Sequence, residues 1–261
     1  MSDSICPVCA GAVATRDHVC GVAPYVGKKM QGLHCEQCGL IQFPANLGEF
    51  EKNLNRQSSV GQLRDARNAG DGRPGREYHM VRMAMEMLDR PAAKISFFGS
   101  GMNRDWQWVL NTYPQSSVNL VDLKNFQEVA HFEAIDRATP SDIVVASEVI
   151  EHFTEPLEHF RSLLRLVRND GILICSTNVY DGSDMSQHMY PFIPGHVAYW
   201  TPLSLVKLAA DSGFFVDFRT PQMGLTRGGP RKKYVLFYRQ VEVFYRVSLY
   251  FGTHMHAPSE A

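Results

Sequence analysis

Two pairs of cysteines near the start of the chain have the spacing of metal ligands. Cys6 and Cys9 form one Cys-x-x-Cys pair, Cys35 and Cys38 form the second, and a glycine follows each pair closely. Two thiolates in such a turn bind one metal ion, and four thiolates make a closed tetrahedral zinc site with no position left for a substrate. The sequence therefore predicts a structural zinc ion held by these four side chains.

The distribution of cysteines also points to a cellular setting. Five of the six cysteines lie in the first 38 residues, and the sixth is Cys175. The N-terminus lacks the basic start and apolar run of a secretory signal, and no apolar stretch is long enough for a transmembrane segment. We therefore expect a reducing, cytoplasmic location, where clustered cysteines bind metal. Cys20 is interpreted as a small buried side chain, with a role as substitute ligand, shared with His34, as the alternative.

Glycines and an acid occupy the ends of two predicted strands further along. Gly99-Ser100-Gly101 follows an apolar strand, and Asp122 ends the next strand about twenty residues later. Glycines allow a backbone to approach a ligand closely, and a carboxylate at that place can accept both hydroxyls of a ribose. Tight packing of the loop and helix capping by Asp122 are the structural alternatives. Together the loop and the acid predict a nucleoside cofactor.

The elements that must position these residues alternate between strands and helices after residue 75. This alternation predicts an α/β fold: a Rossmann-like, seven-stranded, mostly parallel sheet with helices on both faces, plus a small N-terminal zinc ribbon. We expect the ribbon over residues 1–44, a linker over 45–75 with a short helix near 48–57, and the α/β domain over 76–261. The predicted strands are 94–98, 117–121, 132–135, 142–146, 171–176, 214–219 and 234–239, and the predicted helices are 77–88, 103–112, 125–130, 155–167, 202–212 and 241–251.

The segment from Ser141 to Asn178, with its Glu148-x-x-Glu151-His152 exit, resembles class I S-adenosylmethionine-dependent methyltransferases, and the resemblance extends over about residues 76–240. It implies an enzyme that binds S-adenosylmethionine. Phe97 stands where the family usually has an acid, and Asn103 where a third glycine is common. The cofactor contacts that the resemblance implies are Gly99, Ser100 and Gly101 for the methionine part, Asp122 for the ribose, and Ser147 or Glu148 for the amino-acid part.

The Glu148-x-x-Glu151-His152 segment is also similar to one that binds a divalent metal in small-RNA 2′-O-methyltransferases and ubiquinone-pathway O-methyltransferases. That similarity implies a second site, for magnesium or another divalent metal, completed by His188 or His196. Such a metal would hold substrate oxygens and lower the pKa of a hydroxyl. The alternative without metal makes His152 or His196 the general base, beside Glu151, because an imidazole titrates near neutrality.

Three functions compete for this chain. The first is O-methylation of a saccharide or a small natural-product hydroxyl, with the acceptor held by residues 179–200, a long segment in which we expect no helix or strand. The second is an RNA methyltransferase that uses the ribbon for recognition, with the basic run 227–233 touching phosphate. A net charge of −1 argues against nucleic acid as a partner. The third is a degenerate, non-catalytic partner protein. A homo-oligomer is compatible with each of them.

Overall fold

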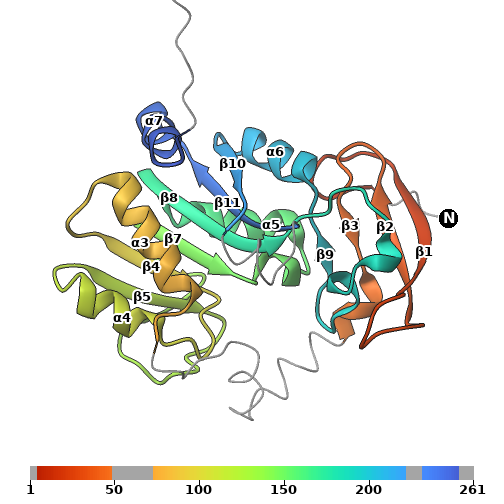
Figure 1. Cartoon of the computed structure of the whole chain (residues 1–261), viewed down its shortest axis with the longest axis horizontal. Coiled ribbons are helices and arrows are strands. Elements are labelled where there is room, and N and C mark those ends of the chain that lie inside the picture. Colours follow the sequence, from red (N-terminus) through yellow and green to blue (C-terminus); the bar gives the residue numbers. More distant parts are fainter. Residues whose placement is uncertain (1–4, 49–72, 222–230, 253–261) are drawn as a thin grey trace, which may run out of the picture.

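The computed structural model describes residues 5–48, 73–221 and 231–252. At its centre lies a seven-stranded sheet in the order β10-β11-β8-β7-β4-β5-β6 (Figure 1). Neighbouring strands from β8 to β6 run parallel, whereas β11 pairs antiparallel with both β8 and β10. This is the predicted Rossmann-like sheet. Its strands are β4 (Lys94–Phe98), β5 (Ser117–Asp122), β6 (Phe132–Ala134), β7 (Ser141–Ser147), β8 (Val167–Asn178), β10 (Phe215–Arg219) and β11 (Lys232–Tyr238).

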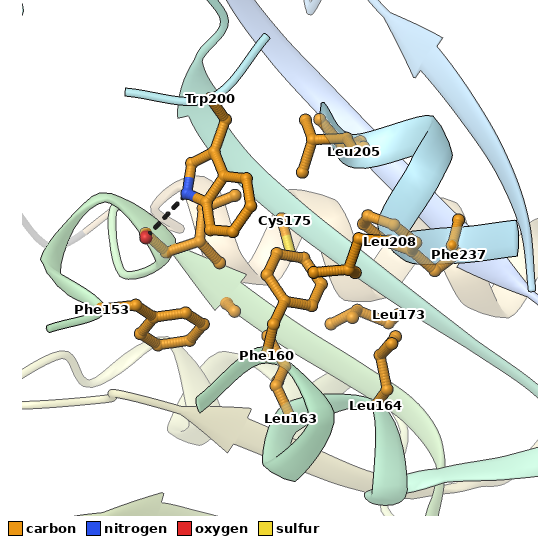
Figure 2. Packing of buried hydrophobic residues seen from close by; sticks show 14 of the residues in the cluster. Phe153, Phe160, Leu163, Leu164, Leu173, Cys175, Trp200, Leu205, Leu208 and Phe237 are labelled. Atoms are coloured by element: carbon orange, nitrogen blue, oxygen red, sulfur yellow. Dashed lines mark hydrogen bonds between the residues drawn. The ribbon is translucent and has the colours of Figure 1, made fainter. Parts of the chain in front are cut away.

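Helices cover both faces of this sheet. On one face lie α3 (Arg76–Leu88), α4 (Asp105–Thr112) and α7 (Val241–Tyr250), whose apolar residues share one core cluster with Ile95 and Ile143 of the sheet. The methionines of α3 belong to this core. On the other face lie α5 (Pro156–Arg165) and α6 (Pro202–Asp211). Phe160 of α5 lies against Trp200 (Figure 2). Their ring centroids are 5.2 Å apart.

A second, four-stranded sheet carries the cysteine pairs. Its order is β1 (Val13–Val19), β2 (Lys29–Cys35), β3 (Ile41–Gln42) and β9 (Ala198–Tyr199), all antiparallel. Strand β9 comes from the α/β region, so the N-terminal lobe, defined here as residues 5–48, is joined to that region by backbone pairing (Figure 1). Cys6, Val8 and Leu40 of the lobe also lie in the same apolar cluster as α5 and α6.

Two predicted elements differ from those observed. Residues 125–130 form turns rather than a helix, because the Asn125 side chain accepts from the Val129 N–H (3.1 Å) and donates to the Val129 carbonyl (2.9 Å). Such local side-chain bonds compete with helical ones. Residues 179–200, expected as an irregular segment, contain two short 3-10 helices, η3 (Met185–Gln187) and η4 (Tyr190–Phe192), as well as β9.

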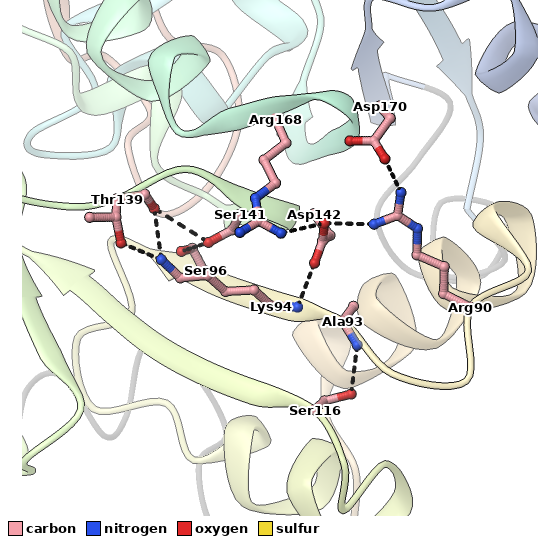
Figure 3. A network of polar contacts seen from close by, with 10 residues as sticks. All are labelled: Arg90, Ala93, Lys94, Ser96, Ser116, Thr139, Ser141, Asp142, Arg168 and Asp170. Carbon is pink, nitrogen blue, oxygen red and sulfur yellow. Dashed lines mark hydrogen bonds and ion pairs between the residues drawn. The ribbon is translucent and has the colours of Figure 1, made fainter.

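An ionic network braces the sheet at the amino ends of β7 and β4. Asp142 accepts hydrogen bonds from Arg90 (2.6 Å), Arg168 (2.9 Å) and the Lys94 N–H (2.7 Å), as Figure 3 shows. Burial alone would raise the pKa of Asp142, but these donors outweigh it and lower that pKa. Arg90 also pairs with Asp170. The network lies at the opposite end of these strands from the glycine loop and is structural.

None of the described helices is long and apolar enough to cross a membrane. The ribbon and linker boundaries at residues 44 and 75 stay predictions. The short helix predicted near 48–57 and most of the basic run 227–233 lie outside the described residues.

Candidate active site

The glycine loop leaves β4 in a conformation that its residues permit. Gly99 and Gly101 have φ angles of 65° and 51°, in the left-handed region that favours glycine. A Cβ added at Gly99 would lie 2.7 Å from Cγ2 of Val149. The loop therefore packs directly against the segment that follows β7. This contact brings the two predicted functional segments, the glycine loop and residues 147–152, side by side.

Asp122 fixes the same loop from the end of β5. Its Oδ2 accepts from the Gly101 N–H at 2.8 Å, and its Oδ1 accepts from the Leu123 N–H at 2.7 Å. Gln127 adds a clamp, since its Nε2 donates to the carbonyls of Gly101 (3.0 Å) and Asn103 (2.7 Å). The Asp122 side chain thus sits buried beside the loop, where a carboxylate can accept further hydrogen bonds from a ribose.

The two departures from the family pattern have clear structural roles. Phe97 is 2% exposed and packs in the core beneath α3. Asn103 accepts from the Asp105 N–H at 2.6 Å, and Asp105 in turn accepts from the N–H groups of Gly75 (2.8 Å) and Tyr78 (3.1 Å). The loop is therefore held by Asp122, Gln127 and this chain of bonds to the start of α3, with no acid needed at position 97.

Glu148, at the exit of β7, is the centre of an ionic cluster. Its carboxylate accepts from Nη1 of Arg76 at 2.8 Å and from Nζ of Lys232 at 2.6 Å, and Ser176 donates to it at 3.1 Å. Arg76 Nη1 also donates to the Ser147 hydroxyl at 3.1 Å. Two cations converge on one carboxylate, so the cluster carries an excess positive charge beside the end of β7.

Glu151 is fully buried and is held from two sides. The Tyr190 hydroxyl donates to its Oε1 at 2.5 Å, and the Thr177 hydroxyl donates to its Oε2 at 3.3 Å. Burial and the neighbouring Glu151 carboxylate raise the pKa of Tyr190 well above its usual value. Tyr190 therefore stays protonated and acts as a donor to Glu151.

Two histidines complete a cluster with Glu151. His152 Nδ1 lies 2.8 Å from the Gly195 carbonyl, which can only accept, so Nδ1 carries the proton and Nε2 is the nitrogen that accepts one. The His152 and His196 rings meet edge-on, with centroids 4.8 Å apart. Burial and the nearby His152 lower the pKa of His196 well below its usual value. Nδ1 of His196 is buried, and no residue in the described part of the chain forms a hydrogen bond with it.

The structure brings some of the predicted divalent-metal ligands together and separates others. One ligand atom each from Glu151, His152 and His196 lies within 4.8 Å of the other two. Glu148 is instead engaged with Arg76 and Lys232. His188 is bound through Nδ1 to the Tyr199 hydroxyl (3.0 Å) and through Nε2 to the Ser183 hydroxyl (2.8 Å).

The four cysteines of the lobe converge as predicted from their spacing. The sulfurs of Cys6 and Cys38 are 3.6 Å apart and those of Cys9 and Cys35 are 3.3 Å apart, and all four lie within 4.8 Å of one another. A regular tetrahedron with zinc–sulfur bonds of about 2.3 Å has sulfur–sulfur edges of about 3.8 Å. The donor set and the spacing therefore fit zinc. Cys20 is buried elsewhere, and its thiol donates to the Val22 carbonyl.

The lobe also holds the segment of residues 185–196 that carries Tyr190 and His196. Asn46 Nδ2 donates to the carbonyls of Pro191 (3.0 Å) and His196 (2.8 Å), and Lys28 Nζ donates to the Phe192 carbonyl (2.7 Å). The Gly21 N–H donates to the Ser186 carbonyl at 2.8 Å. The position of the histidine cluster thus depends on the lobe.

Several residues of this site carry no signal in the sequence. Gln127 and Arg76 are single polar residues far in sequence from the motifs that they contact. Lys232 belongs to the basic run 227–233, which indicated phosphate rather than Glu148. In the sequence, Tyr190 is one residue of the segment 179–200, and Thr177 directly follows the predicted strand 171–176. Their partners are distant in sequence, so spacing could not identify them.

Comparison with known proteins identifies the family. Residues 48–217 match the model of a family described as "Methyltransferase domain". No curated protein is significantly similar to the chain in sequence.

Among solved structures, an O-methyltransferase family protein from Burkholderia thailandensis is 16% identical, with a TM-score of 0.49, over 72% of this chain and 63% of that one. The mitomycin 7-O-methyltransferase is 16% identical, with a TM-score of 0.46, over 63% and 53%. A methyltransferase of calicheamicin biosynthesis, in its SAH-bound form, is 12% identical, with a TM-score of 0.43, over 61% and 54%. The chain thus spans less than two thirds of the length of each. By this family match, which spans more than half of its residues, the chain belongs to the methyltransferase-domain family.

Proposed function

We propose that this protein transfers the methyl group of S-adenosylmethionine to a hydroxyl of a small molecule, a saccharide or another natural product. The observation that carries the proposal is the position of the Glu151–His152–His196 cluster. Glu151 and His152 of this cluster come shortly after β7. Val149, in the same segment, packs against Gly99 of the glycine loop. A cofactor on the loop and an acceptor at the cluster would then be neighbours, as in-line transfer requires.

The residues around the loop fit the cofactor. Gly99 and Gly101 give the loop after β4 its left-handed turns, and Asp122 is placed beside that loop to accept the ribose hydroxyls. The excess positive charge around Ser147 and Glu148 suits the carboxylate of the methionine part, with Arg76 and Lys232 as the cations. The bound cofactor would supply a sulfonium-activated methyl group.

His152 is our choice for the general base. Its Nδ1–H is held by the Gly195 carbonyl, which presents Nε2 as the atom that takes a proton from the acceptor hydroxyl. His196 remains neutral and packs edge-on against His152, so it fixes the ring without adding positive charge. Glu151, bonded to Tyr190, supplies a nearby negative charge that stabilises the imidazolium once formed.

A divalent cation in the same cluster is the second candidate, favoured by the orphan Nδ1 of His196. Glu151, His152 and His196 would hold the ion, and such an ion would supply Lewis acidity to an acceptor oxygen. Metal analysis of the purified protein separates the two. One zinc per chain, with turnover independent of added magnesium or manganese, supports the base. A second bound ion, with turnover that requires it, supports the cation.

We also propose that zinc occupies the Cys6–Cys9–Cys35–Cys38 cluster as a structural ion. Its four thiolates leave no open position, and they anchor the lobe that holds residues 185–196. Because zinc binds reduced cysteines and the cytoplasm keeps cysteines reduced, this site favours a cytoplasmic location.

The test of the function is methyl transfer to a panel of hydroxyl-bearing sugars and phenols, followed by mass spectrometry. We expect a product 14 mass units heavier from the wild type and, for His152→Asn, a kcat lower by about 10²-fold or more. His79→Asn, an exposed change on α3, is the matched control and should keep full activity. Binding of RNA that weakens as the salt concentration rises, together with methylation of RNA but of none of the small molecules, would instead indicate an RNA methyltransferase.

A further inference from the structure

We infer that a pocket between the N-terminal lobe and the end of β8 binds an anionic group of the acceptor through Arg231. The inference rests on the proposed function and names the class of acceptor: a small hydroxyl compound that carries a carboxylate or a phosphate. The pocket is lined by Val22 of the lobe, by Asn178 and Arg231, and by residues 187–190. Its volume of about 280 Å³ is near the lower end of small-molecule sites, a size suited to a single ring.

Arg231 is the cation available in this pocket. The Val179 N–H donates to its carbonyl at 2.9 Å, which fixes Arg231 beside the end of β8. Within the described part of the chain its guanidinium makes no hydrogen bond. It forms an ion pair with Asp181 at 3.9 Å, beyond hydrogen-bond distance. The neighbouring Lys232, by contrast, is buried and pairs with Glu148 in the cluster that we assign to the cofactor. A guanidinium whose N–H donors make no hydrogen bond to the described residues suits a carboxylate or a phosphate.

The other polar linings carry no competing positive charge. His188 points its two nitrogens at Tyr199 and Ser183, and burial, followed by the charge of Arg231, lowers the pKa of His188. Its imidazole therefore stays neutral near pH 7. Asn178 adds an amide whose Oδ1 is buried and has no hydrogen-bond partner among the described residues. A buried amide oxygen left without a donor is costly, and a bound molecule with a hydroxyl would satisfy it.

The pocket adjoins the proposed catalytic cluster through Tyr190. This tyrosine lines the pocket, donates to Glu151 and packs its ring 4.3 Å from that of His196. Asn178 directly follows Thr177, which also donates to Glu151. An acceptor seated with its anion on Arg231 would thus extend along the Tyr190 wall, with its reactive hydroxyl toward His152 and His196. Arg231 would then determine specificity rather than take part in proton transfer.

Calorimetry on the full-length protein tests this with three ring compounds: 4-hydroxybenzoate, its neutral isostere 4-hydroxybenzamide, and phenyl phosphate. We expect the wild type to bind at least one of the two anions about tenfold or more tightly than the amide, the size of a charge-assisted hydrogen bond. A preference for benzoate identifies a carboxylate acceptor, and a preference for phenyl phosphate a phosphorylated one. Arg231→Gln should remove the preference, Arg231→Lys should keep part of it, and Arg161→Gln, an exposed arginine on α5, should keep all of it.

Thermal unfolding of each variant establishes that it is folded. Equal affinity of the wild type for anions and amide, binding of none of the three, or a preference that survives in folded Arg231→Gln would each overturn the inference. These outcomes are separable from the function itself. If the protein binds S-adenosylmethionine and transfers methyl groups, but Arg231→Gln changes neither acceptor affinity nor turnover, only this inference is overturned. If the protein binds anions through Arg231 but does not bind S-adenosylmethionine, the anion site remains and the proposed function is overturned.

Discussion

The hydroxyl of Tyr190 donates a hydrogen bond of 2.5 Å to the buried carboxylate of Glu151, across 39 residues of sequence. It joins the segment that the lobe holds to the segment that leaves β7. Because Tyr190 also packs on His196, one side chain links the acid, the histidine pair and the pocket wall. The catalytic cluster is thus assembled from two distant parts of the chain, and its geometry depends on their docking.

Tyr190→Phe should therefore lower kcat while the variant remains folded. The ring remains on His196, but the buried Glu151 carboxylate keeps Thr177 as its only side-chain donor within the described ranges. We expect a loss of about 1–3 kcal/mol in the free energy of unfolding, and a fall in kcat of about tenfold or more as the cluster loosens. Tyr245→Phe, on the exposed face of α7, is the control. Unchanged kcat in a measurably destabilised Tyr190→Phe would show that the bond serves the fold alone.

Gly99→Ala should weaken cofactor binding. The added methyl would meet Val149 at 2.7 Å, and the φ of 65° is unfavourable for alanine. Gly182→Ala is a matched control, because Gly182 has a φ of 84° and no atom of the described residues lies within 4 Å of the added Cβ. Both variants carry backbone strain of about 1–2 kcal/mol, but only Gly99→Ala displaces the loop. Calorimetric affinity for S-adenosylmethionine should fall about tenfold or more in Gly99→Ala and stay unchanged in Gly182→Ala.

Loss of zinc should loosen residues 185–196. Cys35→Ser removes one thiolate from the four, and the lobe that anchors Pro191, Phe192 and His196 would lose its staple. Metal analysis should give about one zinc per chain for the wild type and for Cys20→Ser, and markedly less for Cys35→Ser. Hydrogen exchange in residues 185–196 should accelerate in the zinc-poor variant. Full zinc content in Cys35→Ser would contradict the four-cysteine site.

Asp142 should make stability depend on pH at the acid end. Its pKa is lower in the folded chain than the unfolded value of about 3.9, so its stabilisation is present above that value. As the pH falls through the folded pKa, the carboxylate takes a proton and the stabilisation is lost. Asp142→Asn should therefore cost about 1–3 kcal/mol at pH 7, and the gap to the wild type in urea unfolding should narrow on acidification. Asp136→Asn, at an exposed site, should change neither the stability at pH 7 nor its dependence on pH. A gap that widens on acidification would contradict the assignment.

The sequence predicted what local patterns determine. The Cys-x-x-Cys spacing, the apolar strands and the glycines at the end of β4 depend on residues close together in the chain, and each appears where predicted. The helix expected at 125–130 failed because one side chain, Asn125, closes a local turn that propensity does not reveal. The sequence motif identified Glu148 but not its ion pairs, because its partners Arg76 and Lys232 come from α3 and β11, which are distant in sequence. The pairing of β9 with β3 is likewise a product of tertiary docking.

The most direct test of the account is calorimetric titration of the purified chain with S-adenosylmethionine, because it needs no knowledge of the acceptor. We predict one binding site per chain, with the affinity reduced about tenfold or more in Asp122→Asn, whose carboxylate lies beside the glycine loop. An absence of binding by the folded, zinc-loaded wild type would contradict the account and indicate a non-catalytic partner protein.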